Sequence, residues 1–161
     1  MFKKIIPAIL LGVMLISSLS LQSCKKDDDD DTTPTPTPTP TLYERLGGIN
    51  AISAVTDQFL ANVVADPVIN ARFAATVADA NRTRLLRLNL IDQICAAAAG
   101  PCQYKGLTMI QAHQGMNITE SEFNALVGDL VSAMTTLGVA QADQNELLGI
   151  LGGLKPDIVG Q

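Results

Sequence analysis

The sequence GPCQYKGLTMIQAHQG spans residues 100–115 and contains His113, the only histidine of the chain. Glycine and proline near its start predict a loop over residues 99–106. The residues from Leu107 to Gln114 then predict a short helix that ends at Gly115. Such a histidine is either a metal ligand or an ordinary core or surface residue, and the flanking sequence has to distinguish the two.

Upstream of this stretch, apolar residues recur at helical spacing. Residues 50–65 and 79–98 each present one apolar stripe and predict two long helices. The first helix ends before Pro67, because a residue that precedes proline leaves the α region, and the second ends at Gly100-Pro101. Between them, the residues around Phe73 predict a short irregular segment.

Downstream, the pattern is again helical. Thr119 and Glu122 have the spacing of a capping box, which predicts the start of a helix that keeps one apolar face as far as Leu137. A last helix is expected over residues 141–151. Because no strand pair is expected anywhere, the predicted fold class is all-α.

Composition limits the kinds of partner that the protein can have. The chain has 161 residues, of which 47% are hydrophobic, and its net charge is −5. A chain of this length is expected to form one compact domain, which we place at residues 42–161. An acidic chain does not favour phosphate contacts, so nucleic acid is not an expected partner.

Residues 1–23 have the pattern of a secretory signal peptide. Lys3 and Lys4 precede a mostly apolar run, and a small residue, Ser23, stands directly before Cys24. This is typical of a lipoprotein signal, in which the cysteine becomes the lipidated first residue of the mature protein. The alternative is a transmembrane anchor, for which the apolar run is barely long enough.

Residues 24–41 predict a disordered stalk that begins at the lipidated cysteine. After two lysines, five aspartates (Asp27 to Asp31) lead into alternating threonine and proline, with no large apolar side chain to bury. Alternating proline favours an extended polyproline II conformation. The Ser-Cys-Lys-Lys-Asp-Asp start resembles the surface-export signal of lipoproteins in some Gram-negative bacteria. We therefore expect an exported lipoprotein at the outer membrane or the cell surface.

Several short motifs follow one another through residues 42–161. The domain opens with LYERLGG at residues 42–48, and Phe59 and Ala65-Asp66-Pro67 follow it. Phe73 comes next, and residues 100–115 supply the pattern GPxxYxG and then MxxxHxG. In this order and spacing the motifs resemble the truncated haemoglobins, specifically group 1. The resemblance covers essentially the whole of the domain.

This resemblance implies a two-over-two helical sandwich around a haem b. It places the proximal iron ligand at His113, and Phe73 at the position of the phenylalanine that stacks on the haem. One axial histidine suffices for haem, and no motif for covalent haem attachment is present. The two layers are then expected to be formed by helices 50–65 with 79–98 and 119–137 with 141–151.

The side of the haem that binds gas departs from the family pattern. Many members carry a tyrosine where this chain has Leu60, and the distal helix often supplies a glutamine where this chain has Leu90. The distal gate position falls on Leu86, so that Leu60, Phe73, Leu86 and Leu90 are expected to line an apolar pocket. A buried hydrogen-bond donor would stabilise the negative charge that oxygen gains on binding, and its lack predicts weak retention of oxygen. A register shifted by one turn would bring Asn89 inward.

Other side chains are expected at the edge of the haem. Met109, four residues before His113, is expected to line the pocket rather than to ligate the iron. At least one cationic or hydrogen-bonding side chain is expected to reach a propionate. The candidates are Arg82, Arg84, Arg87, Tyr104 and Lys105.

Cys95 and Cys102 are seven positions apart across a predicted helix end and turn. Export permits a disulfide between them, which would hold the loop that leads to His113. The alternative is that Cys95 is an ordinary core residue of its helix. A zinc site is less favoured, because two cysteines and one distant histidine fall short of four ligands.

These observations predict a haem-binding globin that binds oxygen, nitric oxide or carbon monoxide. We expect no enzymatic activity. Nitric oxide dioxygenation would require a stable oxygen complex and a reductase, and any redox partner is unidentified. Hydrolysis is not expected, since a single histidine supports no nucleophile–histidine pair. The alternative function is a surface module that captures haem or uses the globin fold for interaction. The chain is expected to contact the lipid membrane through acylated Cys24.

Overall fold

The computed structural model describes residues 38–161. The predicted signal peptide, Cys24 and the stalk up to residue 37 lie outside the described residues. Within residues 38–161 the chain is helical, and the only β-type pairing is an isolated bridge between Ile118 and Val159. The all-α prediction is therefore confirmed. No helix of this part of the chain is both long and apolar enough to cross a membrane.

Five of the observed helices correspond to the predicted ones within a few residues. Two helices were not predicted, α1 and α3, and a short 3₁₀ helix, η1, closes the domain. In chain order the elements are α1 (Leu42–Arg45), α2 (Gly48–Ala65), α3 (Asn70–Val77), α4 (Ala80–Ala97), α5 (Met109–His113), α6 (Glu120–Thr136), α7 (Gln141–Gly152) and η1 (Lys155–Asp157).

The segment around Phe73 is helix α3, so the prediction of an irregular segment there was wrong. A turn that precedes this helix is stabilised by Asp66. The Asp66 side chain accepts a hydrogen bond from the backbone N–H of Val68 at 2.8 Å, and the Asp66 backbone carbonyl accepts one from the N–H of Asn70 at 2.9 Å. The helix is only eight residues long. Two turns are too few for a clear apolar period, which is why the sequence pattern did not reveal it.

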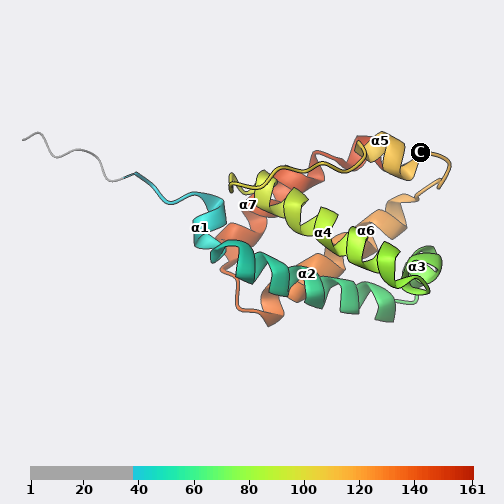
Figure 1. The fold of residues 1–161 in the computed structure, drawn as a ribbon, viewed down its shortest axis with the longest axis horizontal. Helices are drawn as coiled ribbons and strands as arrows, with labels where there is room; N and C mark the ends of the chain where they lie inside the picture. Colours follow the sequence, from blue (N-terminus) through green and yellow to red (C-terminus); the bar gives the residue numbers. More distant parts are fainter. Residues whose placement is uncertain (1–37) are drawn as a thin grey trace, which may run out of the picture. The chain divides into compact units, whose positions relative to one another are not determined.

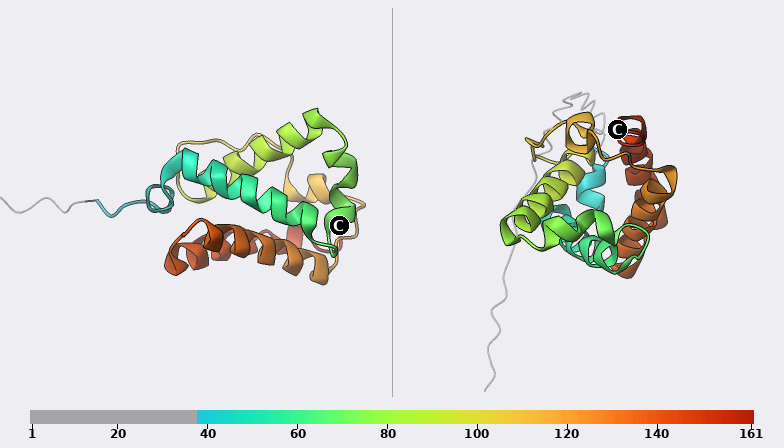
Figure 2. Two further views of the ribbon diagram at one scale, coloured as in Figure 1. Left: turned by 90° about the horizontal axis from the view of Figure 1, so that it is seen from below. Right: turned by 90° about the vertical axis from the view of Figure 1, so that its right-hand side faces the viewer.

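The long helices form two layers. Helices α2 and α4 make one layer and α6 and α7 the other, as the two-over-two arrangement requires (Figures 1 and 2). The main contact between the layers is α2 on α6. Val63 of α2 and Ala133 and Met134 of α6 are completely buried.

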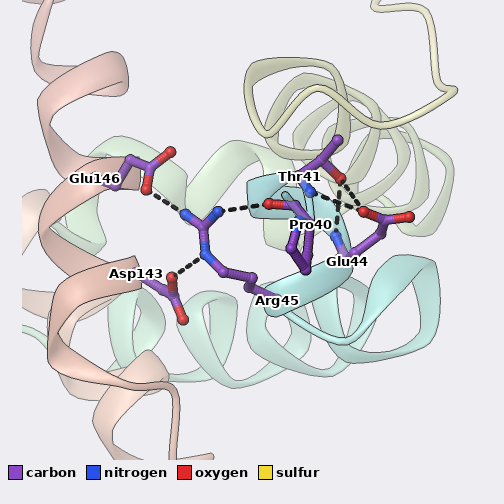
Figure 3. A network of polar contacts seen from close by, with 6 residues as sticks. All are labelled: Pro40, Thr41, Glu44, Arg45, Asp143 and Glu146. Carbon is purple, nitrogen blue, oxygen red and sulfur yellow. Dashed lines mark hydrogen bonds and ion pairs between the residues drawn. The ribbon is translucent and has the colours of Figure 1, made fainter. Parts of the chain in front are cut away.

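Helix α1 is tied to α7 by one arginine. The Arg45 guanidinium donates to Asp143 at 2.7 Å, to Glu146, and to the backbone carbonyl of Pro40 at 2.9 Å (Figure 3). The side chain remains 30% exposed, so the network is a surface brace rather than a buried ion pair. It fixes the point at which the chain enters the domain.

Cys95 and Cys102 are joined by a disulfide, with their Cα atoms 5.7 Å apart. Cys95 is completely buried near the end of α4, and Cys102 lies in the loop that leads to α5. The bond therefore connects the end of one long helix to the segment that carries His113. Gly100 lies between the two cysteines and packs against Cys95 and the ring of Tyr43.

We expect Gly100→Ala to destabilise the domain by about 1–3 kcal/mol, the usual cost of overpacking. A Cβ atom at this position would lie 2.5 Å from Cδ2 of Tyr43, 2.7 Å from Sγ of Cys95 and 2.8 Å from the Cys95 carbonyl oxygen. Urea unfolding measures the change. Gly128→Ala, in α6 with open space around it, is the control and should stabilise by about 0.5–1 kcal/mol. Equal stability of the two variants would contradict this packing argument.

Candidate functional site

A cavity of about 480 Å³ opens among α3, α4, α5 and the beginning of α6. This volume is within the range of cofactor and ligand sites. Most of the side chains that surround the cavity are apolar. The apolar ones are Phe59, Ile69, Phe73, Leu85, Leu86, Leu90, Leu107, Met109, Ala112, Met116, Ile118, Phe123, Leu126 and Ile158.

His113 is the last residue of α5, and its side chain lines the cavity. A capping box between Thr108 and Gln111 begins this helix and so sets its position after the loop. Nδ1 of His113 lies 2.8 Å from the carbonyl oxygen of Met109. A carbonyl only accepts, so Nδ1 carries the proton and donates. The lone pair of Nε2 is therefore available to a metal ion.

The structure brings six of the eight predicted haem contacts to this cavity. They are His113, Phe73, Leu86, Leu90, Met109 and Tyr104. The Tyr104 hydroxyl donates to the carbonyl of Leu107 at 2.8 Å, and burial raises the pKa of this phenol.

The other two predicted contacts, Leu60 and Arg87, are not among the residues that line the cavity. Leu60 is half-buried against the domain core. Arg87 donates to both carboxylate oxygens of Asp57 on α2, at 2.5 and 2.8 Å. The reason is helical geometry, because each step along α4 turns the side chain by about 100°. Arg87, directly after Leu86, therefore points to the neighbouring helix.

Two polar residues of α4, Asn89 and Gln93, line the cavity and were not predicted as contacts. Asn89 corresponds to the register alternative in which it faces inward. The Gln93 amide donates to the sulfur of Met109 at 3.4 Å, so it links α4 to α5. Asn89 and Gln93 follow Leu86 by three and seven positions, so the three residues share one face of α4. This helical spacing is the sequence signal that could have identified them as cavity residues.

Among the cationic candidates for propionate contact, Arg82 lines the cavity, whereas Arg84 and Lys105 do not. Nε of Arg82 lies 3.8 Å from a carboxylate oxygen of Asp79. The Arg82 side chain is 66% exposed, so this ion pair is weak. Arg82 is therefore free to turn toward an anionic group at the cavity edge.

The residues of the cavity fit a haem. Nε2 of His113 offers a neutral imidazole ligand, and the surrounding walls are apolar, as an uncharged macrocycle requires. Leu85 and Leu107 line the cavity and are 52% and 59% exposed, so they offer apolar surface that a macrocycle would cover. Within residues 38–161 no group of three or more histidine, cysteine or acidic side chains is placed to hold a bare metal ion.

Comparison with known proteins points in the same direction. The family model described as bacterial-like globin matches residues 41–159. A group 1 truncated haemoglobin of Mycolicibacterium paratuberculosis is 35% identical over 118 residues, which are 73% of this chain and 83% of the relative. Another, from Tetrahymena pyriformis, is 33% identical over 121 residues, covering 75% and 96%.

Solved structures show the same relationship. The ferric truncated haemoglobin of Tetrahymena pyriformis superposes with a TM-score of 0.69 at 30% identity, over 76% of this chain and all of that one. A 2/2 haemoglobin of Synechococcus, solved in the cyanomet state with covalently attached haem, superposes with a TM-score of 0.67 at 28% identity, over 74% of this chain and 98% of that one.

Proposed function

Because this chain belongs to the group 1 truncated haemoglobins, and so binds haem and a diatomic gas, we propose that His113 is the axial ligand of the haem iron in the cavity described above. Phe73, Leu86, Leu90, Met109 and Tyr104 would surround the macrocycle, and Arg82 would face a propionate. The haem iron supplies the gas-binding centre, and the protein supplies the ligand, the apolar walls and the exclusion of water.

The hydrogen bond from His113 Nδ1 to the Met109 carbonyl carries this proposal. It selects the tautomer in which Nε2 is unprotonated, and it holds the ring in one orientation. A carbonyl acceptor also makes the imidazole a better electron donor than an unbonded ring. Since acceptor and ring belong to one five-residue helix, the geometry is already present in the protein itself.

We further propose that the gas-binding side of the cavity retains oxygen weakly. Leu86 and Leu90 occupy the half-buried part of the wall that α4 provides, whereas Asn89 is exposed to solvent and the Gln93 amide is already bonded to Met109. Carbon monoxide and nitric oxide depend less on a hydrogen-bond donor and should be less affected. Because nitric oxide dioxygenation depends on a stable oxygen complex, we favour ligand binding without turnover.

A second candidate function is the capture of haem for transfer to another protein. The half-exposed Leu85 and Leu107 at the cavity favour it, because apolar surface that is open to solvent gives a haem a route into and out of the cavity. Haem transfer to apomyoglobin separates the two functions. A gas-binding globin should keep its haem for hours and form a stable carbon monoxide complex after reduction, whereas a capture module should release its haem within minutes. The absence of a Soret band after haem addition would exclude both.

For the location we propose an exported lipoprotein anchored through acylated Cys24 at the outer membrane or cell surface. The proposal rests on the sequence pattern of residues 1–41. The wild-type chain should incorporate labelled fatty acid and partition with membranes when expressed in a Gram-negative host. Cys24→Ser should abolish the label and leave the haem spectrum unchanged. Equal labelling of the two chains would refute the anchor.

A further inference from the structure

The loop between α5 and α6 follows His113 directly and is held in an unusual backbone conformation. Gly115 and Asn117 both have positive φ values, of 78° and 50°. Asparagine is among the few residues other than glycine that adopt this region readily. The backbone N–H of Met116 donates to the carbonyl of His113 at 2.9 Å, so the loop is joined to the histidine itself.

Three consecutive residues of this loop are bound by elements from elsewhere in the chain. Nη1 of Arg72, on α3, donates to the Met116 carbonyl at 2.8 Å. The backbone N–H of Asn117 donates to the Gln161 carbonyl, and the Ile118 carbonyl accepts from the N–H of Gly160 at 2.9 Å. We call residues 158–161 the C-terminal clasp.

The other nitrogens of the Arg72 guanidinium bind the first turn of α6. Nε and Nη2 donate to the two carboxylate oxygens of Glu122, at 2.6 and 3.1 Å. Glu122 also accepts from Thr119 in the capping box, and these bonds together lower the pKa of its carboxyl group to about 2. Arg72 thus joins three segments: α3, the first turn of α6, and the loop after His113.

Helix α5 needs such support because it has only five residues. A helix of this length is not stable by itself, since too few hydrogen bonds offset the cost of starting it. His113 is its last residue, where fraying is greatest. The position of the imidazole therefore depends on what holds the loop that follows.

We propose that Arg72 and the C-terminal clasp are positioning elements for His113, which hold its ring in the orientation that a haem iron requires. The inference rests on the proposed role of His113 as the axial ligand. Arg72 itself lines the cavity, as do Met116, Ile118 and Ile158 of the loop and the clasp, so loosening either part would also disturb its wall. The iron–histidine band and amide exchange in the haem-free chain therefore distinguish positioning of His113 from a direct contact of Arg72 with haem.

Arg72→Met tests this inference, and Arg45→Met is its matched control. Arg45 likewise donates to one backbone carbonyl and to carboxylates, and its side chain is 30% exposed against 35% for Arg72 (Figure 3). It lies between α1 and α7 and lines no part of the haem cavity. The two variants should therefore lose similar stability, while only one of them should affect the histidine.

The full chain with haem is compared by resonance Raman spectroscopy in the ferrous state and by haem transfer to apomyoglobin. In Arg72→Met we expect the iron–histidine stretching band to shift or broaden and haem loss to accelerate about tenfold, the factor that corresponds to one charge-assisted hydrogen bond. Arg45→Met should match the wild type in both measurements. In the haem-free chain, amide exchange of Met116 and Asn117 should accelerate only in Arg72→Met.

Deletion of residues 159–161 provides a second variant, should Arg72→Met fold poorly. It removes both backbone bonds of the clasp and should shift the same Raman band. If Arg72→Met and the deletion both behave like Arg45→Met, the positioning inference is wrong, but the assignment of His113 as the haem ligand is unaffected. If the ferrous wild-type chain shows no iron–histidine band, or if His113→Ala keeps the wild-type ferrous absorption spectrum, the proposed ligand is wrong, and the inference fails with it.

Discussion

His113→Ala should abolish the five-coordinate ferrous haem spectrum and weaken haem binding by more than about 100-fold. Loss of a group that only orients a metal ligand costs about 10- to 100-fold in affinity, so loss of the ligand itself should cost more. No second histidine and no free thiol of the domain can replace it, because the chain contains a single histidine and Cys95 and Cys102 are joined in a disulfide. Absorption spectra with dithionite and carbon monoxide, and haem titration of the purified chain, measure the effect.

Ile110→Ala is the control for this variant. Ile110 lies on the same short helix, is 49% exposed and does not line the cavity. It should keep the wild-type spectrum. Free imidazole added to His113→Ala should restore much of the ferrous spectrum, since the space left by the ring admits it. An unchanged spectrum in His113→Ala would overturn the assignment of the ligand.

Leu90→Gln should slow oxygen dissociation by about 10- to 100-fold, because it adds a buried hydrogen-bond donor next to a ligand that gains negative charge. Leu90 is half-buried and lines the cavity from α4. Carbon monoxide dissociation should change much less, since that ligand gains little charge. Stopped-flow and flash-photolysis kinetics of the two gases measure both effects.

Leu88→Gln makes the same substitution two positions earlier on the same helix. Leu88 is 40% exposed and does not line the cavity, so neither gas should be affected. If oxygen dissociation is unchanged in Leu90→Gln, the apolar wall of α4 does not control oxygen retention. If both variants slow it equally, the effect does not arise from a donor in the cavity.

The long helices were predictable because their information is local. Apolar residues at spacings of three and four, together with Pro67, Gly100 and the capping box at Thr119, determine where these helices begin and end. Of the short elements, α5 was predicted but α1 and α3 were not. Helices α1 and α3 have four and eight residues, too few for a clear apolar period, and only α1 begins with a capping box.

The predicted haem contacts came from motif order, and the structure places most of them around one cavity. His113, Phe73 and Leu86 were assigned from motif order, and the structure brings them to one cavity. Leu60 and Arg87 were assigned in the same way and do not line it. A motif gives the position of a residue along its helix. The rotation of that helix in the packed domain decides which of the adjacent side chains faces the cavity.

The sequence by itself determined the all-helical class, the long helices and the one histidine able to serve as an iron ligand. Tertiary structure alone decided that Arg87 pairs with Asp57 on α2. It alone also decided that Arg72 and the chain end at Gln161 hold the loop behind His113. The physical reason is distance along the chain. Helical periodicity is set by residues three and four apart, whereas Arg72 and Gln161 reach the loop from α3 and from the last residue of the chain.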